Sequence, residues 1–270
     1  MDEAPTGHYP IERREGEIER LHIQSAALAP DCDVMLERIG VGAGWTCLDL
    51  GCGPGGIAAL LSTRVGKSGR VVGLDADAAF IEYARQHAAP NVEFIVGDAY
   101  RTKLAGGGFD LVHTRFIAST AGEPENLIRE AIRLAKPGGF VAMQEPDMAS
   151  LNCYPPNESW DQLKAAMLGA FARAGTDICL ARRLYELARL AGLADVQYRP
   201  CLLGVRSQDP WVDYLPAVVE SLRGTIIGKG LLSQDELTSA LAGCRAHLRN
   251  PSVVFTSFTV GQVWGRTPNV

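Results

Sequence analysis

Three carboxylates and one glycine-rich segment are spaced along this chain as a nucleotide-binding site would require. Asp49 stands just before the segment 51–56 (Gly-Cys-Gly-Pro-Gly-Gly), Asp75 ends the next apolar run, and Asp98 ends the run after that. Glycine lets a backbone approach a ligand closely and adopt dihedrals that other residues avoid. Because parallel strands present their carboxyl ends at one edge of a sheet, we expect the three acids to meet there beside a cofactor loop.

The identity of the nucleotide depends on Asp49. The spacing Gly51-x-Gly53-x-x-Gly56 also satisfies the dinucleotide fingerprint, which leaves a nicotinamide-dependent oxidoreductase as one alternative. A carboxylate two residues before the first glycine would repel a pyrophosphate, whereas it would attract an ammonium or sulfonium group. The sequence therefore favours a cationic ligand.

Five short motifs follow one another between residues 40 and 147. They are Leu48–Gly53 (LDLGCG), Gly73–Asp75 (GLD), Gly97–Ala99 (GDA), Phe109–Val112 (FDLV) and Lys136–Gly139 (KPGG). In this order and spacing the chain resembles the class I S-adenosylmethionine-dependent methyltransferases, and among them the bacterial small-molecule enzymes of the ubiquinone/menaquinone type. The resemblance implies S-adenosyl-L-methionine as cofactor and methylation of an oxygen, carbon or nitrogen atom of a small molecule.

The resemblance also assigns cofactor contacts. Asp75 would accept hydrogen bonds from the two ribose hydroxyls, Asp98 and Ala99 would contact the adenine, and Asp49 would support the loop or the ammonium group. The cofactor-binding residues that it implies are Gln24, Asp49, Gly51, Cys52, Gly53, Asp75, Ala76, Asp98, Ala99 and Thr114. No metal ligand set is expected.

A second group of residues is expected on the acceptor side of the site. His113 ends the fourth predicted strand and has a near-neutral intrinsic pKa, so it could act as a general base; a histidine that is merely satisfied by a backbone partner is the alternative. Relatives carry a histidine near the position of Thr120, and its absence here keeps a non-methylating or binding protein among the alternatives. Arg115 could hold an acidic substrate group, or pair with Glu123 or Asp147.

Further residues could line the acceptor pocket, or could only belong to the core or to a surface helix. The substrate-binding candidates, Arg115 included, are Tyr9, His22, Arg115, Glu145, Tyr154 and Trp211. Trp160, Phe171, Tyr214 and Phe255 add aromatic surface that is more often core than pocket.

The elements that must position these residues alternate between apolar runs and helical periods. This alternation predicts an α/β fold, a doubly wound, seven-stranded Rossmann-like sheet. Residues 1–40 are expected to form an N-terminal helical lid, with helices at 12–28 and 31–39 separated by Pro30. Residues 41–147 are expected to form the cofactor-binding core. Residues 148–270 are expected to complete the sheet, with strands over 195–205 and 252–264, and to add cap helices in two insertions, about 148–176 and 207–250.

Composition narrows the class of function. A net charge of −5 lacks the basic surface that a nucleic-acid substrate requires. No apolar stretch is long enough to span a membrane, and seven cysteines without paired spacing suggest reduced thiols. We therefore expect a cytoplasmic protein with a small-molecule partner and no membrane or nucleic-acid partner, and a homodimer stays open.

Overall fold

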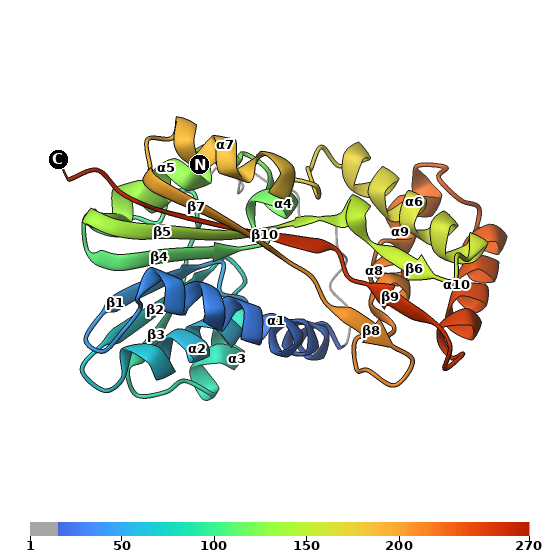
Figure 1. Cartoon of the computed structure of the whole chain (residues 1–270), viewed down its shortest axis with the longest axis horizontal. Coiled ribbons are helices and arrows are strands. Elements are labelled where there is room, and N and C mark those ends of the chain that lie inside the picture. The colour runs from blue at the N-terminus through green and yellow to red at the C-terminus, as the bar shows by residue number, and fades with distance from the viewer. Residues whose placement is uncertain (1–15, 270) are drawn as a thin grey trace.

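The computed structural model describes residues 16–269 and shows a large sheet joined to a smaller cap (Figure 1). The large sheet has seven strands in the order β3-β2-β1-β4-β5-β10-β7. The first five strands are parallel, and β10 runs antiparallel to both of its neighbours. The strands are β1 (Thr46–Leu50), β2 (Arg70–Asp75), β3 (Val92–Val96), β4 (Phe109–Arg115), β5 (Ala135–Asp147), β7 (Ala194–Cys201) and β10 (Thr259–Arg266).

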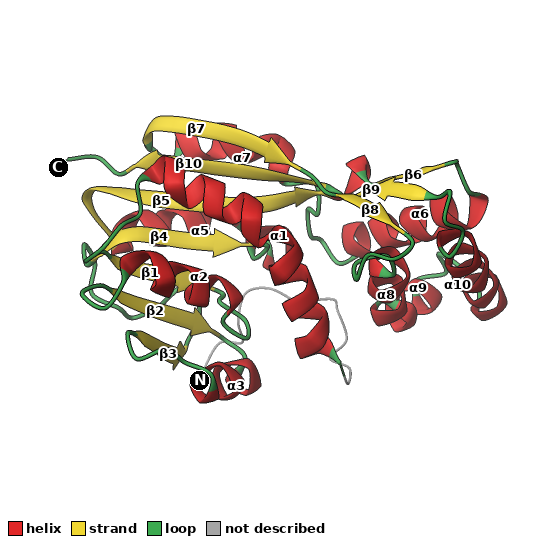
Figure 2. Cartoon of the chain, turned by 60° about the horizontal axis from the view of Figure 1, so that its bottom comes forward, coloured by secondary structure: helices red, strands yellow, loops and turns green. Residues whose placement is uncertain are grey.

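Helices cover both faces of this sheet, as Figures 1 and 2 show. Buried side chains of α1, α2 and α3 form one apolar layer, and those of α5 and α7 form the other. The short helix α4 follows β4. The helices are α1 (Glu17–Ile39), α2 (Gly56–Val65), α3 (Ala78–Gln86), α4 (Ala118–Ala121), α5 (Pro124–Leu134) and α7 (Ala181–Leu190). This confirms the α/β, doubly wound prediction.

Side chains of β4 alternate between the two layers, as a strand requires. Leu111 packs in the layer of α1, α2 and α3, while Val112 packs in the layer of α5 and α7. His113 and Arg115 share the face of Leu111 because they follow it at intervals of two. This alternation directs both basic side chains toward α1 and the first strand.

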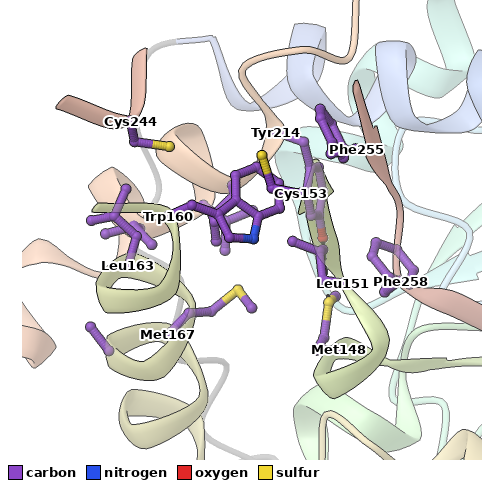
Figure 3. Close-up of a cluster of buried hydrophobic side chains, with 14 of the residues drawn as sticks. Met148, Leu151, Cys153, Trp160, Leu163, Met167, Tyr214, Cys244, Phe255 and Phe258 are labelled. Carbon is purple, nitrogen blue, oxygen red and sulfur yellow. Dashed lines mark hydrogen bonds between the residues drawn. The ribbon is translucent and has the colours of Figure 1, made fainter. Parts of the chain in front are cut away.

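The cap has an apolar core of its own. Helices α6, α8 and α10 pack together, and a three-stranded sheet in the order β6-β9-β8 lies beside them. Figure 3 shows Trp160 of α6 between Met167, Leu151 and Cys153, and Trp160 is only 1% exposed. The cap elements are η1 (Met148–Ser150), β6 (Asn152–Tyr154), α6 (Glu158–Arg173), β8 (Gly204–Arg206), α8 (Tyr214–Ser221), α9 (Arg223–Gly228), α10 (Gln234–Leu248) and β9 (Val254–Thr256).

Two details of the predicted elements were wrong. Helix α1 continues through Pro30, although a proline inside a helix removes one hydrogen bond and costs about 3 kcal/mol. The segment after Pro30 buries Cys32, Met35 and Leu36 completely, and this burial offsets that cost. The runs predicted as single strands over 195–205 and 252–264 each divide between the two sheets, because each crosses the junction between the core and the cap.

Within residues 16–269 no helix has the length and apolar character needed to cross a membrane. The same residues contain no cluster of three or more histidine, cysteine or acidic side chains arranged to hold a metal ion.

Candidate active site

A cavity of about 470 Å³ lies at the carboxyl ends of the central strands. Its walls come from the first half of α1, the β1–α2 loop, the ends of β2, β3 and β4, and the cap. One end is polar and carries Asp49, Asp75 and Asp98; the other is apolar and carries Met148 and Phe171. The sheet and the cap therefore enclose one continuous space.

The glycine loop between β1 and α2 forms the floor of the polar end. Gly51 has a φ of 67°, and a Cβ placed there would lie 2.0 Å from Cδ1 of Ile117. Its N–H and that of Cys52 both donate to the carbonyl of Leu74, at 2.6 and 3.0 Å. The loop is thus held against β2, and only glycine fits at its first position.

Two strand-end carboxylates hold backbone groups around this loop. Asp75 accepts hydrogen bonds from the N–H groups of Gly53 and Asp77, both at 2.8 Å. Burial raises the pKa of Asp75, and these two hydrogen bonds oppose the rise. Asp98 accepts from the N–H of Tyr100 at 2.8 Å. Both residues line the cavity, and a carboxylate oxygen can accept more than one hydrogen bond.

His113 lies behind the cavity wall and is completely buried. Its Nδ1 is 2.8 Å from Oδ1 of Asp49, and its Nε2 is 2.9 Å from Nε2 of Gln144. The oxygen of Gln144 accepts from Gln262 at 3.0 Å, which orients the Gln144 nitrogen toward the histidine. Burial lowers the pKa of His113, but the interactions with Asp49 and Cys32 together outweigh this effect and raise the pKa to about 9. The Gln144 nitrogen faces Nε2 of His113. A proton on Nε2 would therefore require the Gln144 side-chain amide to rotate until its oxygen faces the ring.

The interpretation of His113 as a general base is therefore not supported by its placement. Both ring nitrogens are occupied by Asp49 and Gln144, and neither faces the cavity. The ring instead fixes the orientation of Asp49, whose second oxygen, Oδ2, is buried without a partner among the described residues. His113 therefore links Asp49 to Gln144 behind the wall of the cavity.

Glu145 and Thr114 also lie outside the cavity lining. Glu145 is 1% exposed and accepts from the N–H groups of Ala118 and Ser119, both at 3.1 Å, so it holds the start of α4. Burial raises the pKa of Glu145 to about 7. Thr114 is 1% exposed and faces the opposite layer from His113. These placements argue against a substrate role for Glu145 and against a side-chain contact of Thr114 with the cofactor.

Arg115 does line the cavity. Its Nη2 donates to Oγ of Ser25 at 3.1 Å, whereas its buried Nη1 has no partner among the described residues. The two acids considered as its partners from sequence do not pair with it: Asp147 binds Arg182 at 2.9 Å, and Glu123 binds Asn126.

Helix α1 supplies the remaining polar lining. Gln24 faces the cavity and accepts from Arg20 at 3.3 Å. His22 also faces it, and the His22 ring lies 5.4 Å from that of Tyr83, with a buried Nε2 that has no partner in the described chain. Tyr9 lies outside the described residues. Of the other predicted cofactor residues, Asp49, Gly51, Cys52, Gly53, Asp75, Ala76, Asp98 and Ala99 all line the cavity.

The apolar end is built mainly by the cap. Phe171 and Tyr214, which were among the aromatic residues considered from sequence, line it. Tyr154 is 49% exposed on β6, outside the cavity, and Trp211 packs against Tyr214 and Phe258 in the cap core. Neither placement supports a direct contact with a substrate in this cavity.

Sequence reasoning missed several apolar residues of this end. They are Phe116, Ile117, Met148, Ile178 and Val218. Met148 carried a usable signal, since it follows β5 directly and strand ends border the site. Ile178 and Val218 carried none, because their place depends on how the cap folds back.

Comparison with known proteins gives the family. Residues 42–192, more than half of the chain, match the family model described as a methyltransferase domain. The chain is 31% identical to the demethylmenaquinone methyltransferase of Lactococcus lactis, over 61% of this chain and 71% of that protein. It is 32% identical to the trans-aconitate 2-methyltransferase of Azoarcus, over 78% of this chain and 81% of that protein.

Two further matches cover other fractions of this chain and of the matched proteins. An uncharacterised transposon protein of Streptomyces fradiae is 35% identical over 60% of this chain, which spans only 47% of that relative. A putative methyltransferase from an antibiotic biosynthesis pathway of Anabaena variabilis has the same fold, with a TM-score of 0.62 and 17% identity over 88% of this chain and 96% of that one.

The fold and the acid-lined cavity define a class I methyltransferase whose cofactor is S-adenosylmethionine. The chain belongs to the methyltransferase-domain family, together with relatives that act on small molecules. This confirms the resemblance seen in the motifs, and the Lactococcus and Azoarcus relatives are both named as methyltransferases.

Proposed function

We propose that the protein transfers the methyl group of S-adenosylmethionine to a small-molecule acceptor inside the cavity. The observation that carries this proposal is the continuity of the acid-lined end with the apolar end built by the cap. The cofactor would occupy the first end and the acceptor the second. The names of the relatives in Lactococcus and Azoarcus, which refer to a demethylmenaquinone and to trans-aconitate, support a small organic acceptor.

The polar end suits the cofactor residue by residue. The free lone pairs of Asp75 could accept both ribose hydroxyls while its hydrogen bond to Gly53 holds the loop. Asp98 and the N–H of Ala99 would face the adenine edge. The backbone of Gly51 and Gly53 would lie against the methionine part.

Among the described residues, few side chains at the apolar end could donate or accept a proton. The bound cofactor supplies a reactive sulfonium methyl group. Phe116, Met148, Phe171 and Tyr214 line the facing wall, so they would exclude water and orient the acceptor. Orientation alone can supply effective molarities of about 10⁵ to 10⁸ M. We therefore propose catalysis by positioning, without a dedicated base from His113.

Calorimetric titration tests the cofactor assignment. The purified protein should bind S-adenosylhomocysteine saturably and should not bind NAD. Asp75→Ala should weaken S-adenosylhomocysteine binding about 10- to 100-fold, the scale of hydrogen bonds to a charged group. The control Asp235→Ala, an exposed acid on α10, should leave the affinity unchanged. Saturable NAD binding without any response to S-adenosylhomocysteine would refute the proposal.

The charge and composition of the chain bear on the class of acceptor and on the location of the protein. A net charge of −5 and an acid-lined cavity support a small-molecule acceptor over a nucleic acid. We also propose a cytoplasmic location, and light scattering coupled to size-exclusion chromatography would test whether the chain forms a homodimer.

A further inference from the structure

A row of polar side chains crosses five neighbouring strands on the face of the sheet that packs against α1. Its members are Asp49 on β1, His113 on β4, Gln144 on β5, Gln262 on β10 and Arg199 on β7. Gln262 stands directly opposite both Gln144 and Arg199 in the register of the strands. The first four members are buried, none of them more than 2% exposed. Polar groups at this depth are normally hydrogen-bonded, so the state of each member depends on its neighbours.

The hydrogen bonds of this polar row all point the same way. Nη1 of Arg199 donates to Oε1 of Gln262 at 2.8 Å, and Nε2 of Gln262 donates to Oε1 of Gln144 at 3.0 Å. Nε2 of Gln144 lies 2.9 Å from Nε2 of His113, whose Nδ1 lies 2.8 Å from Oδ1 of Asp49. The row therefore runs from a guanidinium, which only donates, to a carboxylate, which only accepts.

The direction of the row is determined at Gln262, two side chains away from the histidine. A guanidinium has no acceptor, so Gln262 must present its oxygen to Arg199. A backbone carbonyl has no donor, and Nε2 of Gln262 also donates to the carbonyl of Asp31 in α1 at 3.0 Å. The carboxylate of Asp31 in turn binds Arg199. Gln144 must then present its oxygen to Gln262 and its nitrogen to His113.

This arrangement leaves one protonation state of His113 compatible with the row. Nε2 of His113 faces an N–H group of Gln144, so it must accept, and the ring proton lies on Nδ1 and is donated to Asp49. Turning over the Gln144 amide alone would set its nitrogen against that of Gln262. Turning over both amides would set a nitrogen of Gln262 against the guanidinium of Arg199. Either mismatch leaves buried polar groups without partners, which is costly.

Other groups on the same face act on His113 in both directions. Burial lowers the pKa of His113, whereas its contacts with Asp49 and Cys32 raise it to about 9 and by themselves favour an imidazolium at neutral pH. Burial raises the pKa of the Cys47 thiol to about 12, so Cys47 stays uncharged. The cation of Arg115, two residues along β4, disfavours a second positive charge on this face. The contacts of His113 and the polar row thus demand different states, and the row prevails because protonation would break it at several bonds.

We propose that Gln144, Gln262 and Arg199 are positioning residues of the cofactor site, which hold His113 neutral and so leave Asp49 with its full negative charge beside the cavity. The binding consequence rests on the proposed function. S-adenosylmethionine carries a positively charged sulfur, whereas the sulfur of S-adenosylhomocysteine is neutral. An uncompensated carboxylate at Asp49 favours the cation, so the polar row contributes to selection of the cofactor over the demethylated product.

Nitrogen-15 NMR of the histidine rings tests the first half of the proposal on the wild-type protein. The chain has five histidines, and the signals lost in His113→Ala assign those of His113. Across about pH 6 to 8, where a free histidine titrates, the wild-type ring should stay neutral with its proton on Nδ1. An imidazolium signal from His113 at neutral pH in the wild type would overturn the proposal.

Gln262→Met tests the control of His113 from a distance, because it changes neither the net charge nor a direct contact of the ring. The freed Gln144 amide can turn its oxygen toward His113, so the ring should become an imidazolium with a pKa near about 9. The preference for S-adenosylmethionine over S-adenosylhomocysteine, measured by calorimetry, should fall about 3- to 10-fold. Gln197→Met is the matched control, since Gln197 is an exposed glutamine of β7 that donates to the carbonyl of Asp195, and it should change neither quantity.

Gln262→Glu provides a second variant of nearly the same shape, for use if Gln262→Met does not fold. Its carboxylate still accepts from Arg199, but it also presents an acceptor to Gln144. Gln144 should then turn its nitrogen toward position 262 and its oxygen toward His113, which again gives an imidazolium. Circular dichroism and thermal unfolding check that each variant is folded.

Two further results would contradict the inference. A neutral His113 ring in the folded variants at Gln262 would show that the polar row does not control its state. An imidazolium in Gln262→Met with an unchanged preference between the two ligands would show that the charge of Asp49 does not select the cofactor. Failure of the wild-type protein to bind either ligand would instead reject the proposed function, and the NMR result would still decide the role of the row.

Discussion

The side chain of His113 illustrates how a strand-end residue can support a site without entering it. Its ring is bonded to Asp49 on one side and to Gln144 on the other, and it is completely buried. Removing the ring would release Asp49, whereas Gln144 would keep its hydrogen bonds to Gln262 and Cys32. The consequence for the enzyme should be a looser cofactor site, while the acid–base chemistry stays the same.

We predict that His113→Ala lowers the free energy of unfolding by about 3 to 5 kcal/mol, because it leaves the buried carboxylate of Asp49 without its hydrogen-bond partner. It should also weaken S-adenosylhomocysteine binding, yet keep the shape of the pH–rate profile of kcat. Chemical denaturation and a rate profile from about pH 6 to 9 provide the measurements. A loss of rate that returns at high pH would instead assign His113 as a base.

Glu145 gives a prediction about stability and pH. Its folded pKa, about 7, lies above the ordinary value of 4.5 because it is buried. Between these values the folded state binds more protons than the unfolded chain, so stability must fall as pH rises. The decrease in the free energy of unfolding should be complete above about pH 7 and absent below about pH 4.5. Its full size should approach about 3 kcal/mol.

Urea unfolding of the wild type and of Glu145→Gln, at intervals between about pH 4.5 and 7.5, measures this effect. The unfolding free energy of the wild type should decline relative to that of the variant across the window. Parallel curves would show that Glu145 does not titrate there in the folded state.

At the scale of elements, the β1–α2 loop depends on the close approach of Ile117, the residue just before α4. A side chain at Gly51 would meet Ile117 at 2.0 Å and would also force a left-handed φ on a residue with a Cβ. We predict that Gly51→Ala lowers the unfolding free energy by about 2 to 4 kcal/mol and greatly weakens cofactor binding. Gly228→Ala is the control, because a Cβ at that position would have no atom within 4 Å and its φ is ordinary. Equal thermal stability and S-adenosylhomocysteine affinity in the two variants would contradict this account of the loop.

How far the elements could be read from sequence follows from their length and periodicity. The glycine-rich segment 51–56 and the acids at or just after the ends of β2 and β3 follow from apolar runs and glycine positions, and the structure brings them together at one cavity. Strands β6, β8 and β9 have only three residues each, too few for an alternating pattern to show. Their pairing depends on segments far apart in the chain, such as Asn152 with Thr256.

The residues of the site also differ in whether the sequence alone could place them. Asp75 could be placed from its own strand, because its role needs only a strand end. The place of His113 depends on partners from β1 and β5, Asp49 and Gln144, so sequence spacing alone left a base and a satisfied histidine equally open. Arg115 was open for the same reason, since Asp147 binds Arg182 of α7 instead.

At the scale of the whole molecule, the cap and the sheet are joined by long strands. In Figure 1, β5 runs from the core toward the cap and β10 returns antiparallel to it, and Asp147 and Thr259 still pair at the cap end. The cap therefore stands at a fixed place over the carboxyl edge. Its contribution to the cavity is apolar, which suits a role in acceptor choice.

We predict that Phe171→Leu changes kcat/KM for the acceptor about 10-fold or more, because a small change of pocket shape alters substrate binding on this scale. The affinity for S-adenosylhomocysteine should stay within about threefold, since Phe171 belongs to the cap wall. Leu190→Ala, at a side chain 77% exposed on α7, is the control and should change neither quantity. Equal losses of acceptor turnover and cofactor affinity would contradict the separation of the two ends.

The most direct test of the central claim is to incubate the purified protein with methyl-labelled S-adenosylmethionine and a cell extract of its host, and to identify the labelled product. Transfer of the label to a small organic molecule, lost in Asp75→Ala, is the predicted result. Label found only in protein or RNA, or no label in any fraction despite tight S-adenosylhomocysteine binding, would contradict it.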